Sequence, residues 1–377
     1  MFHSLSINCA TRICKNTETC YNNHMRIGLY DPYTDALGGG EKYMYTLAEC
    51  LSQNHDVSIF WDRESDIEAI ERRFSLSLKK TRIVKNIFTN KISLKQRISE
   101  SRSYDRIIYL SDGSLPTLLT RNLLIHFQFP VEWITLSIAT KIKFAQVRSV
   151  ICNSQFTKDY IDKKFLIKST VLYPPVDIKA KSMKKENIIL HVGRFAGTTV
   201  EGTDYKKQGV MVEVFKKMID KGLKDWKLII AAGVKSEDEN KFALMIQNAK
   251  NYPIEFLKNE TNDALWETYA KAKIYWHASG YGEDTKKHPE LAEHFGISTV
   301  ESMGAGCVPV VINKGGQKEI VTDGVNGVLW NTEEEWIDKT SQLIENKDML
   351  QMLSRAAKLR AEGFSKELFC QSIHALL

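Results

Sequence analysis

Two glutamates separated by seven residues are the most informative chemical feature of the chain. Glu293 precedes a Phe295-Gly296-Ile297 turn, and Glu301 follows in the first turns of the helix predicted there. A helix N-terminus favours anions, and its first N–H groups have no acceptor within the helix. Carboxylates accept hydrogen bonds from vicinal hydroxyls. Together these groups can hold a polyol that is joined to a phosphate.

A structural alternative exists for one member of the pair. Ser298-Thr-Val-Glu301 matches a capping box, in which Glu301 would bond the backbone at its own helix start. That alternative explains Glu301 and leaves Glu293 without a role.

Cations follow a second predicted strand. Arg194 lies at the carboxyl end of the apolar run 188–193, and Lys206 and Lys207 come before the next helix. A guanidinium and an ammonium at this edge would neutralise a diphosphate and favour its departure. A surface salt bridge is the alternative for each of them.

Two further features are weaker taken singly. Gly39 and Gly40 lie in a Gly-Gly-Gly-Glu run at a predicted helix start, where glycines let the backbone approach a phosphate or sugar. A tight turn explains them equally well. His126 lies near the end of the apolar run 123–127, where a hydrogen-bonded core histidine is the alternative to a site residue.

Alternating apolar and amphipathic stretches must position these residues. Apolar runs of strand length, separated by helical stretches, occur at 25–30, 57–61, 106–110, 123–127, 149–152, 188–193, 227–232, 254–257, 274–277 and 308–312. Continuous apolar strands of this kind are typical of parallel sheets covered by helices on both faces. The sequence therefore predicts an α/β protein with two Rossmann-like domains, and ligands at the carboxyl ends of the strands, in the cleft between the domains.

Composition agrees with a folded two-domain chain. The chain has 377 residues, 43% of them hydrophobic and 26% charged, which excludes disordered, collagen-like and coiled-coil classes. No apolar run approaches the length of about 18 residues that a membrane span needs.

The stretch between residues 63 and 106 is rich in basic residues. It contains twelve basic and six acidic residues, an excess equal to the net charge of +6 of the chain. Beside Ile67, Ile70 and Phe74, this stretch predicts peripheral contact with an anionic membrane surface, and a solvated surface is the alternative.

The seven cysteines suggest no disulfide framework. Cys9, Cys14 and Cys20 lie in the first 24 residues near His3 and His24, but the spacing of a zinc site is missing. Residues 1–24 are expected to form a disordered leader, and no metal site is expected.

Taken in order, these motifs resemble one family, the retaining family 4 glycosyltransferases of GT-B fold, whose hallmark is a Glu, seven residues and a second Glu. The resemblance runs from Met25 to Leu377 and includes Gly315-Gly316-Gln-Lys-Glu319 and residues 323–327. The stretch Glu293-His-Phe-Gly-Ile297 is most similar to the α-1,2-mannosyltransferases of lipid-linked oligosaccharide assembly and their bacterial relatives. That similarity favours GDP-mannose as the donor.

The resemblance implies a role for each residue on the donor. Arg194 and Lys206 would contact the diphosphate, Glu301 the ribose hydroxyls and Glu293 the donor sugar, without a metal ion. The family has its lysine nearer the arginine, so residues 196–205 are interpreted as an insertion that leaves Lys206, rather than Lys207, as the match.

The acceptor side and the turn are implied in the same way. His126 would lie beside the reacting sugar, Gly39 and Gly40 near the diphosphate, and the turn 295–297 at the donor. The loop 280–290 has no assignment.

The resulting domain prediction is a leader (1–24), an N-terminal acceptor domain (25–178), a linker (179–187), a C-terminal nucleotide-sugar domain (188–357), and a C-terminal helix that returns to the first domain (358–377). The expected activity is retaining transfer of a hexose, mannose favoured, from a nucleotide sugar to a glycan or lipid-linked acceptor. We expect no cofactor, no nucleic-acid partner and a cytoplasmic location, peripheral at the inner face of the membrane. A non-catalytic GT-B partner subunit and a nucleotide-sugar hydrolase or epimerase are the alternatives.

Overall fold

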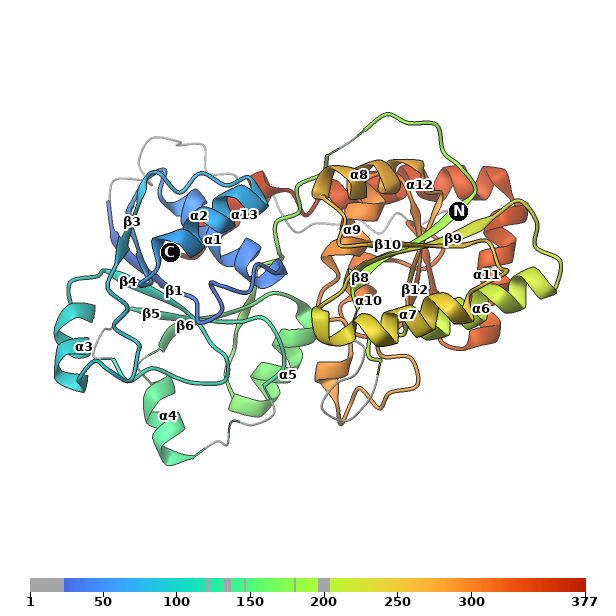
Figure 1. Ribbon diagram of the computed structural model, residues 1–377. Coiled ribbons are helices and arrows are strands. Elements are labelled where there is room, and N and C mark those ends of the chain that lie inside the picture. The colour runs from blue at the N-terminus through green and yellow to red at the C-terminus, as the bar shows by residue number, and fades with distance from the viewer. Residues whose placement is uncertain are drawn as a thin grey trace, which may run out of the picture.

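The computed structural model describes residues 24–118, 122–131, 134, 137–145, 147–179, 181–195 and 204–377. They form two α/β domains that lie side by side (Figure 1). Cys9, Cys14 and Cys20, with the expected leader up to residue 23, lie outside this part of the chain. The same holds for residues 196–203 of the expected insertion.

The N-terminal domain is built on a seven-stranded sheet in the order β3-β2-β1-β4-β5-β6-β7, with all strands parallel. Its strands are β1 (Arg26–Tyr30), β2 (Asp56–Phe60), β3 (Thr81–Val84), β4 (Arg106–Leu110), β5 (Leu123–Phe127), β6 (Val147–Cys152) and β7 (Thr170–Val171). Its helices are α1 (Gly39–Leu51), α2 (Glu64–Phe74), α3 (Leu94–Ser101), α4 (Ile138–Phe144) and α5 (Gln155–Phe165).

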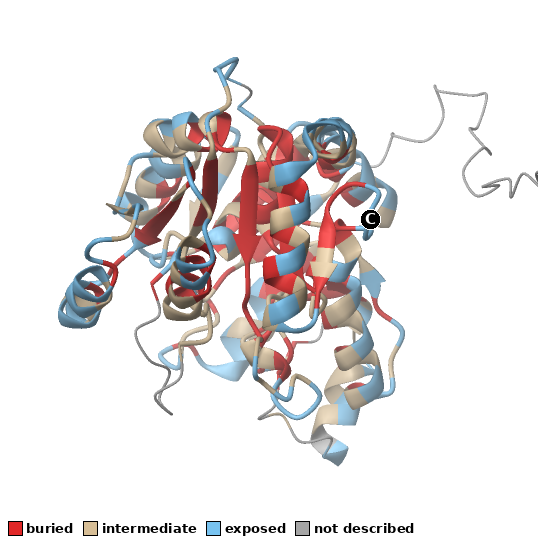
Figure 2. Ribbon diagram, turned by 90° about the vertical axis from the view of Figure 1, so that its right-hand side faces the viewer, coloured by how far each residue is buried: buried red, intermediate tan, exposed pale blue. Residues whose placement is uncertain are grey.

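The C-terminal domain repeats the plan with six parallel strands in the order β10-β9-β8-β11-β12-β13. They are β8 (Ile188–Arg194), β9 (Lys227–Gly233), β10 (Ile254–Lys258), β11 (Ile274–His277), β12 (Val308–Ile312) and β13 (Val328–Trp330). The helices are α6 (Gln208–Asp220), α7 (Glu239–Asn248), α8 (Asn262–Lys271), α9 (Ile297–Gly304), α10 (Gln317–Ile320), α11 (Glu333–Glu345) and α12 (Lys347–Glu362). Figure 2 shows buried strands between helices whose outer faces are exposed.

The predicted fold class is confirmed: two Rossmann-like sheets, with a strand at each of the ten predicted positions. Both sheets reverse their winding beside the first strand of the domain, between β1 and β4 and between β8 and β11. In open α/β sheets, ligands bind at the carboxyl ends of the strands beside such a point. Asp31 and the glycine run follow β1, Arg194 ends β8, and His277 ends β11.

The last helix, α13 (Lys366–Leu376), returns to the N-terminal domain. Its Phe369 and Ile373 are buried in the same cluster as α1, and Cys370 forms a disulfide with Cys50 of α1. The sequence suggested no disulfide framework, and this bond was not predicted. The two cysteines are 320 residues apart, and only the return of the chain brings them together. The preceding helix α12 runs to Glu362, so the expected boundary at 357 falls within it.

The proposed membrane face of α2 is also wrong. Ile67 and Ile70 are buried, and Phe74 packs against the same core. The apolar stripe that was expected to face lipid instead attaches α2 to its own sheet. No helix in the described part of the chain is long and apolar enough to cross a bilayer.

Candidate active site

A cluster of charged groups at the carboxyl edge of the second sheet surrounds Glu293. Lys206, from the turn before α6, donates to Glu293 Oε2 over 2.6 Å, and His277 Nε2 lies 2.9 Å from the same oxygen. The side chains of Lys206 and Glu293 are mostly buried, and that of His277 almost completely. The cluster therefore holds a charged pair in a place that water scarcely reaches.

Burial and pairing act in opposite directions on these groups. Burial opposes ionisation of Glu293, yet Lys206 and His277 outweigh it and hold the pKa of Glu293 well below its usual value. Burial likewise opposes the charge on Lys206, and the Glu293 carboxylate overcomes it and raises the pKa of Lys206. Burial lowers the pKa of His277, so the imidazole is neutral at pH 7 and must carry its hydrogen on Nε2 to bond Glu293.

The two neighbouring lysines point to different partners. Lys207 donates to Glu283 over 2.5 Å, and Glu283 belongs to the loop 280–290 that the sequence left unassigned. Lys314 fixes that loop further by donating to the carbonyls of Gly280 and Glu283. Asp204 holds the turn that carries both lysines, because its carboxylate accepts from the Lys207 and Gly209 amides. The structure thus brings Lys206, and not Lys207, to Glu293.

Arg194 lies exposed at the end of β8. Its charge acts on Lys206 within its own domain and lowers the pKa of Glu41, although burial has the larger effect and raises it. Because Glu41 belongs to α1 of the other domain, the charge of Arg194 acts across the space between the domains.

Glu301 does not cap its own helix. Helix α9 begins at Ile297, after Gly296, so Ser298 is inside the helix and the capping box does not form. The Glu301 carboxylate instead accepts from the Tyr269 hydroxyl over 3.1 Å. Burial raises its pKa, and Lys42, from α1 of the other domain, partly offsets this. The capping alternative is wrong, and Glu301 lies within the electrostatic reach of the N-terminal domain.

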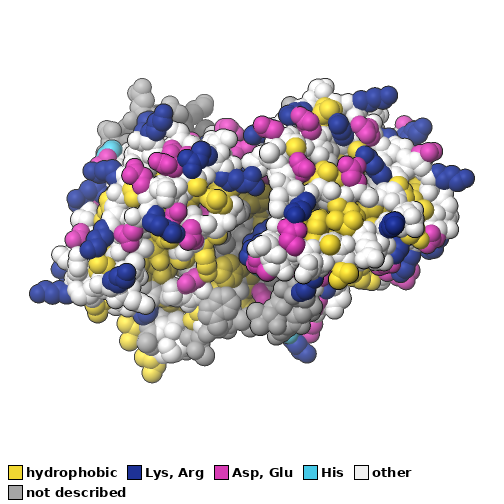
Figure 3. Space-filling model, in the orientation of Figure 1, with side chains coloured by type: hydrophobic (Ala, Val, Ile, Leu, Met, Phe, Trp, Pro, Cys, Tyr) yellow, Lys and Arg dark blue, Asp and Glu magenta, His cyan; other side chains and the backbone are white. Residues whose placement is uncertain are grey.

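The glycine run of α1 meets the turn before α9 across the cleft, which Figure 3 shows as a hollow between the two domains. A Cβ added to Gly39 would lie 3.0 Å from the Ile297 side chain of the other domain. One added to Gly40 would lie 2.2 Å from the Gln128 amide oxygen. Gly39 therefore permits a close approach of the two segments that were expected to hold the donor, and Gly40 leaves room for the Gln128 side chain.

The members of the turn 295–297 differ in what they do. Gly296 has φ +117°, and a Cβ there would lie 2.5 Å from Gln317, so a glycine is required. The Phe295 ring is buried against Tyr173 and Phe364 and serves the core, which leaves only its backbone for a ligand.

His126 is not where it was expected. The ring is fully buried, stacks on Tyr43 at 4.2 Å, and has Nδ1 3.2 Å from the Ile151 carbonyl. Burial lowers its pKa to about 3, so it is neutral. A place beside a reacting sugar requires a ring that faces the cleft, and this one packs inside the N-terminal sheet.

Sequence reasoning missed two residues near this site. His277 was noticed only as part of a strand, although its place at the strand's carboxyl end was a usable signal. Gln128, two residues after His126, emerges from β5 and donates to the Gly40 carbonyl over 3.0 Å. It, rather than His126, is the β5 residue that reaches the glycine run.

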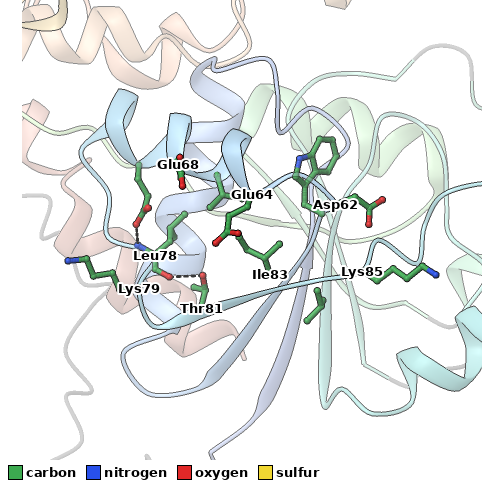
Figure 4. A pocket seen from close by; sticks show the side chains of 12 residues that line it. Asp62, Glu64, Glu68, Leu78, Lys79, Thr81, Ile83 and Lys85 are labelled. Atoms are coloured by element: carbon green, nitrogen blue, oxygen red, sulfur yellow. Dashed lines mark hydrogen bonds between the residues drawn. The ribbon is translucent and has the colours of Figure 1, made fainter.

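A pocket of about 580 Å³ lies elsewhere, between α2 and β3 of the N-terminal domain. Figure 4 shows Glu64, Glu68, Lys79 and Lys85 around it, and none of the sequence-predicted site residues lines it. Within the described ranges, no group of three or more His, Cys, Asp or Glu side chains is placed to hold a metal ion.

Comparison with known proteins gives matches along most of the chain. A family model described as Glycosyl transferases group 1 matches residues 176–360, and one described as Glycosyltransferase Family 4 matches residues 37–180. The chain is 22% identical to the GDP-Man:Man(3)GlcNAc(2)-PP-Dol alpha-1,2-mannosyltransferase of Dictyostelium discoideum, over 92% of this chain and 83% of that protein. The Homo sapiens protein of the same name is 23% identical over 58% of this chain and 46% of its own length.

Solved structures share the fold at low identity. A glycosyltransferase from Rickettsia africae ESF-5 has a TM-score of 0.73 at 17% identity, covering 94% of this chain and 98% of that one. Anabaena Alr3699/HepE, solved in complex with UDP and glucose, has a TM-score of 0.66 at 17% identity, with 94% and 99% covered. Since the two family matches together run from residue 37 to residue 360, the chain belongs to the group 1 glycosyltransferases of family 4, enzymes that transfer a sugar, with the GT-B arrangement of two Rossmann-like domains.

Proposed function

We propose that the protein is a retaining, nucleotide-sugar-dependent hexosyltransferase that uses GDP-mannose and a glycan or lipid-linked acceptor. The observation that carries the proposal is the Lys206–Glu293–His277 cluster, which lies at the carboxyl edge of the second sheet. The similarity to proteins named GDP-mannose-dependent mannosyltransferases favours mannose over other hexoses. Residues 25–178 would bind the acceptor, and residues 188–357 would bind the donor.

The chemistry follows from where charge develops. When the bond between the anomeric carbon and the phosphate oxygen breaks, negative charge builds on the diphosphate and positive charge on the sugar. Arg194 and Lys206 would stabilise that negative charge more in the transition state than in the ground state, and no metal is required for this. The acceptor oxygen then bonds to the anomeric carbon on the same face, and its proton passes to the leaving phosphate.

The carboxylates would bind hydroxyls. Glu293 is held ionised by its two partners, so it can accept from donor sugar hydroxyls, and Glu301 can do the same for the ribose. The first amides of α9, with Gly39 and Gly40 opposite, would lie against the diphosphate.

A lysine pair tests the diphosphate role. Lys206→Ala should lower turnover by about two orders of magnitude or more, because it removes one transition-state donor. Lys207→Ala is the matched control, since that lysine pairs with Glu283, and its effect should be small. Turnover is measured with GDP-mannose and a lipid-linked acceptor. The reverse order of effects would assign the role to Lys207.

Donor identity is tested by a thermal-shift panel of GDP, UDP, ADP and their sugars. A ligand at a hundred times its dissociation constant stabilises the folded state by about 2.7 kcal/mol. GDP and GDP-mannose should give the largest shifts. Turnover without any acceptor would favour the hydrolase or epimerase alternative. No shift with any nucleotide would favour the partner-subunit alternative.

We further propose a peripheral contact with anionic lipid at the inner face of the membrane, which would give access to a lipid-linked acceptor. The basic stretch 63–106 supplies charge, and α4 supplies apolar surface, because Ile138 and Ile142 are 79% and 60% exposed beside the exposed Lys141. Figure 3 shows apolar side chains at the lower end of the N-terminal domain, where Figure 1 places α4. Sedimentation with anionic vesicles should be salt-sensitive and stronger than with neutral ones.

A further inference from the structure

Helix α5 of the N-terminal domain is completed by a carboxylate of the other domain. Ser154 accepts from the Thr157 amide over 3.0 Å, as an N-cap does. The two amides that this cap leaves open, those of Gln155 and Phe156, donate to Glu319 over 2.6 and 2.7 Å. Glu319 belongs to α10, so each oxygen of one carboxylate bridges the two domains, which Figure 1 shows meeting at α5.

The segment that carries Glu319 also holds the loop of Glu293. The Gly316 amide donates to the Glu293 carbonyl over 2.8 Å. The backbones are so close that a Cβ on Gly315 would lie 2.3 Å from that carbonyl oxygen, and one on Gly316 would lie 2.5 Å from the carbonyl oxygen of His294. Residues 315–319 therefore touch the site loop at one end and α5 at the other.

A second contact joins the same two elements. The His294 ring stacks on Phe156 of α5 with centroids 6.4 Å apart and planes 11° apart, and it also faces Phe129 at 6.3 Å. The residue after Glu293 thus packs on the helix whose first amides Glu319 binds.

The bridging carboxylate is itself held in place. Arg360 of α12 donates to the Glu319 carbonyl over 2.7 Å. Burial raises the pKa of Glu319, and the Gln155 and Phe156 amides, with the Tyr173 hydroxyl, partly offset this. These supports distinguish it from a surface glutamate that happens to lie near a helix start.

We propose that Glu319 is a positioning residue of the transferase: it couples closure of the two domains to the geometry of the donor loop around Glu293. The inference rests on the proposed function, because that function gives Glu293 its role on the donor. When the domains separate, Glu319 leaves α5 and His294 leaves Phe156. The loop then loses the surface that fixes it from outside.

A matched control exists on α2 and α8. Arg73 donates to the Asn262 side-chain oxygen over 2.9 Å, and Asn262 donates back to the Arg73 carbonyl over 3.1 Å. This bridge also joins the domains, but no contact described here links it to the loop of Glu293. Asn262→Ala therefore weakens a bridge between the domains without touching the proposed coupling.

The first measurement is amide hydrogen exchange at single-residue resolution, which needs no substrate. In Glu319→Ala, the Gln155 and Phe156 amides and those of residues 294–297 should exchange about ten times faster or more. Glu319→Gln keeps one acceptor oxygen and should fall between. Asn262→Ala should leave both sets unchanged. Unchanged exchange at α5 in Glu319→Ala, or a change there without one at 294–297, overturns the coupling. A melting temperature like that of the wild type excludes general loosening.

The second measurement is GDP affinity and the split between KM and kcat. Glu319→Ala should weaken GDP binding by about tenfold, in line with the loss of hydrogen bonds to a charged group, and raise KM more than it lowers kcat. Asn262→Ala should stay within about twofold of the wild type. Equal GDP affinity in Glu319→Ala and Asn262→Ala contradicts the inference. If the wild type binds no GDP, the proposed donor is wrong, and the exchange result still decides the coupling.

Discussion

At the scale of single residues, the site depends on a carboxylate that is kept ionised in a buried place. A lone buried carboxylate takes up a proton, so the charge of Glu293 needs the two donors that it has in Lys206 and His277. Lys206 is proposed to contact the diphosphate directly. His277 has one ring nitrogen on Glu293 and the other buried, so it acts by holding that carboxylate.

His277→Ala should lower kcat/KM by about tenfold to a hundredfold, the usual cost of a lost hydrogen bond to a charged group. His277→Gln has an amide that can occupy the position of Nε2, so it should recover much of that loss. A steady-state series of wild type, Gln and Ala variants measures it. Equal losses in the two variants would show that the imidazole itself, and not its donor, is needed.

Asp31, directly after β1, should make the free energy of unfolding depend on pH. A substitution of this one residue tests that dependence. Burial and then Glu41 raise its pKa to about 8, so the folded state keeps a proton that the unfolded chain releases near pH 4. Its contribution to the free energy of unfolding is complete below about pH 4, is lost as the pH rises toward 8, and is constant above.

Asp31→Asn removes that dependence. Relative to the wild type, the variant should therefore gain stability steadily between pH 5 and pH 8. Urea unfolding at several pH values in this window measures the difference. A difference that does not change with pH would mean that Asp31 is ionised in the folded protein.

At the scale of elements, the sequence predicted what depends on local pattern. The continuous apolar strands were predictable because burial on both faces of a sheet restricts a strand to apolar residues. The glycine run was predictable because a close approach of two backbones restricts the residue type to glycine. The strands β3, β7 and β13 escaped notice, since the first is a partly exposed edge strand and the others have two and three residues. The proximity of Glu293 and Lys206 was predictable, because loops at the carboxyl edge of a parallel sheet meet there, and their roles on the donor stay predictions.

The predictions that failed concern the direction in which a side chain points and contacts between residues far apart in the sequence. Residues two apart on a strand point to the same face, so the strand pattern does not distinguish His126 from Gln128. Gln128 follows the end of β5 and reaches the glycine run, whereas His126 lies within the strand, and the sequence alone could not show this difference. The capping box of Glu301 failed because the helix starts two residues sooner than Ser298 implied.

The start of α9 depends on one glycine. Gly296 has a positive φ and no room for a side chain beside Gln317, so Gly296→Ala should cost about 1–3 kcal/mol of stability and also weaken donor binding. Gly222→Ala is the matched control, because Gly222 has φ +105° but no atom within 4 Å of an added Cβ. It should show the backbone cost only, with donor binding intact. Denaturant unfolding and GDP titration of both variants separate the two effects.

At the scale of the whole molecule, the chain crosses between the domains twice. The two crossings bond to each other, since the Val176 amide donates to the Phe364 carbonyl over 2.8 Å. The second crossing ends in α13, which lies on α1 through the buried Phe369 and Ile373 and an ion pair between Lys366 and Glu49. The disulfide between Cys50 and Cys370 makes this attachment covalent and encloses the entire second domain in one loop.

Closing so long a loop restricts the unfolded chain strongly. Cys370→Ser should therefore lower the free energy of unfolding by about 2–4 kcal/mol, the usual contribution of a disulfide. A reductant should lower the stability of the wild type by the same amount and leave the variant unchanged, which separates loss of the bond from loss of packing by α13. Denaturant unfolding of both proteins with and without reductant measures this. A variant as stable as the oxidised wild type would mean that the hydrophobic packing of Phe369 and Ile373, which are buried in the same cluster as α1, is sufficient to hold the returning helix.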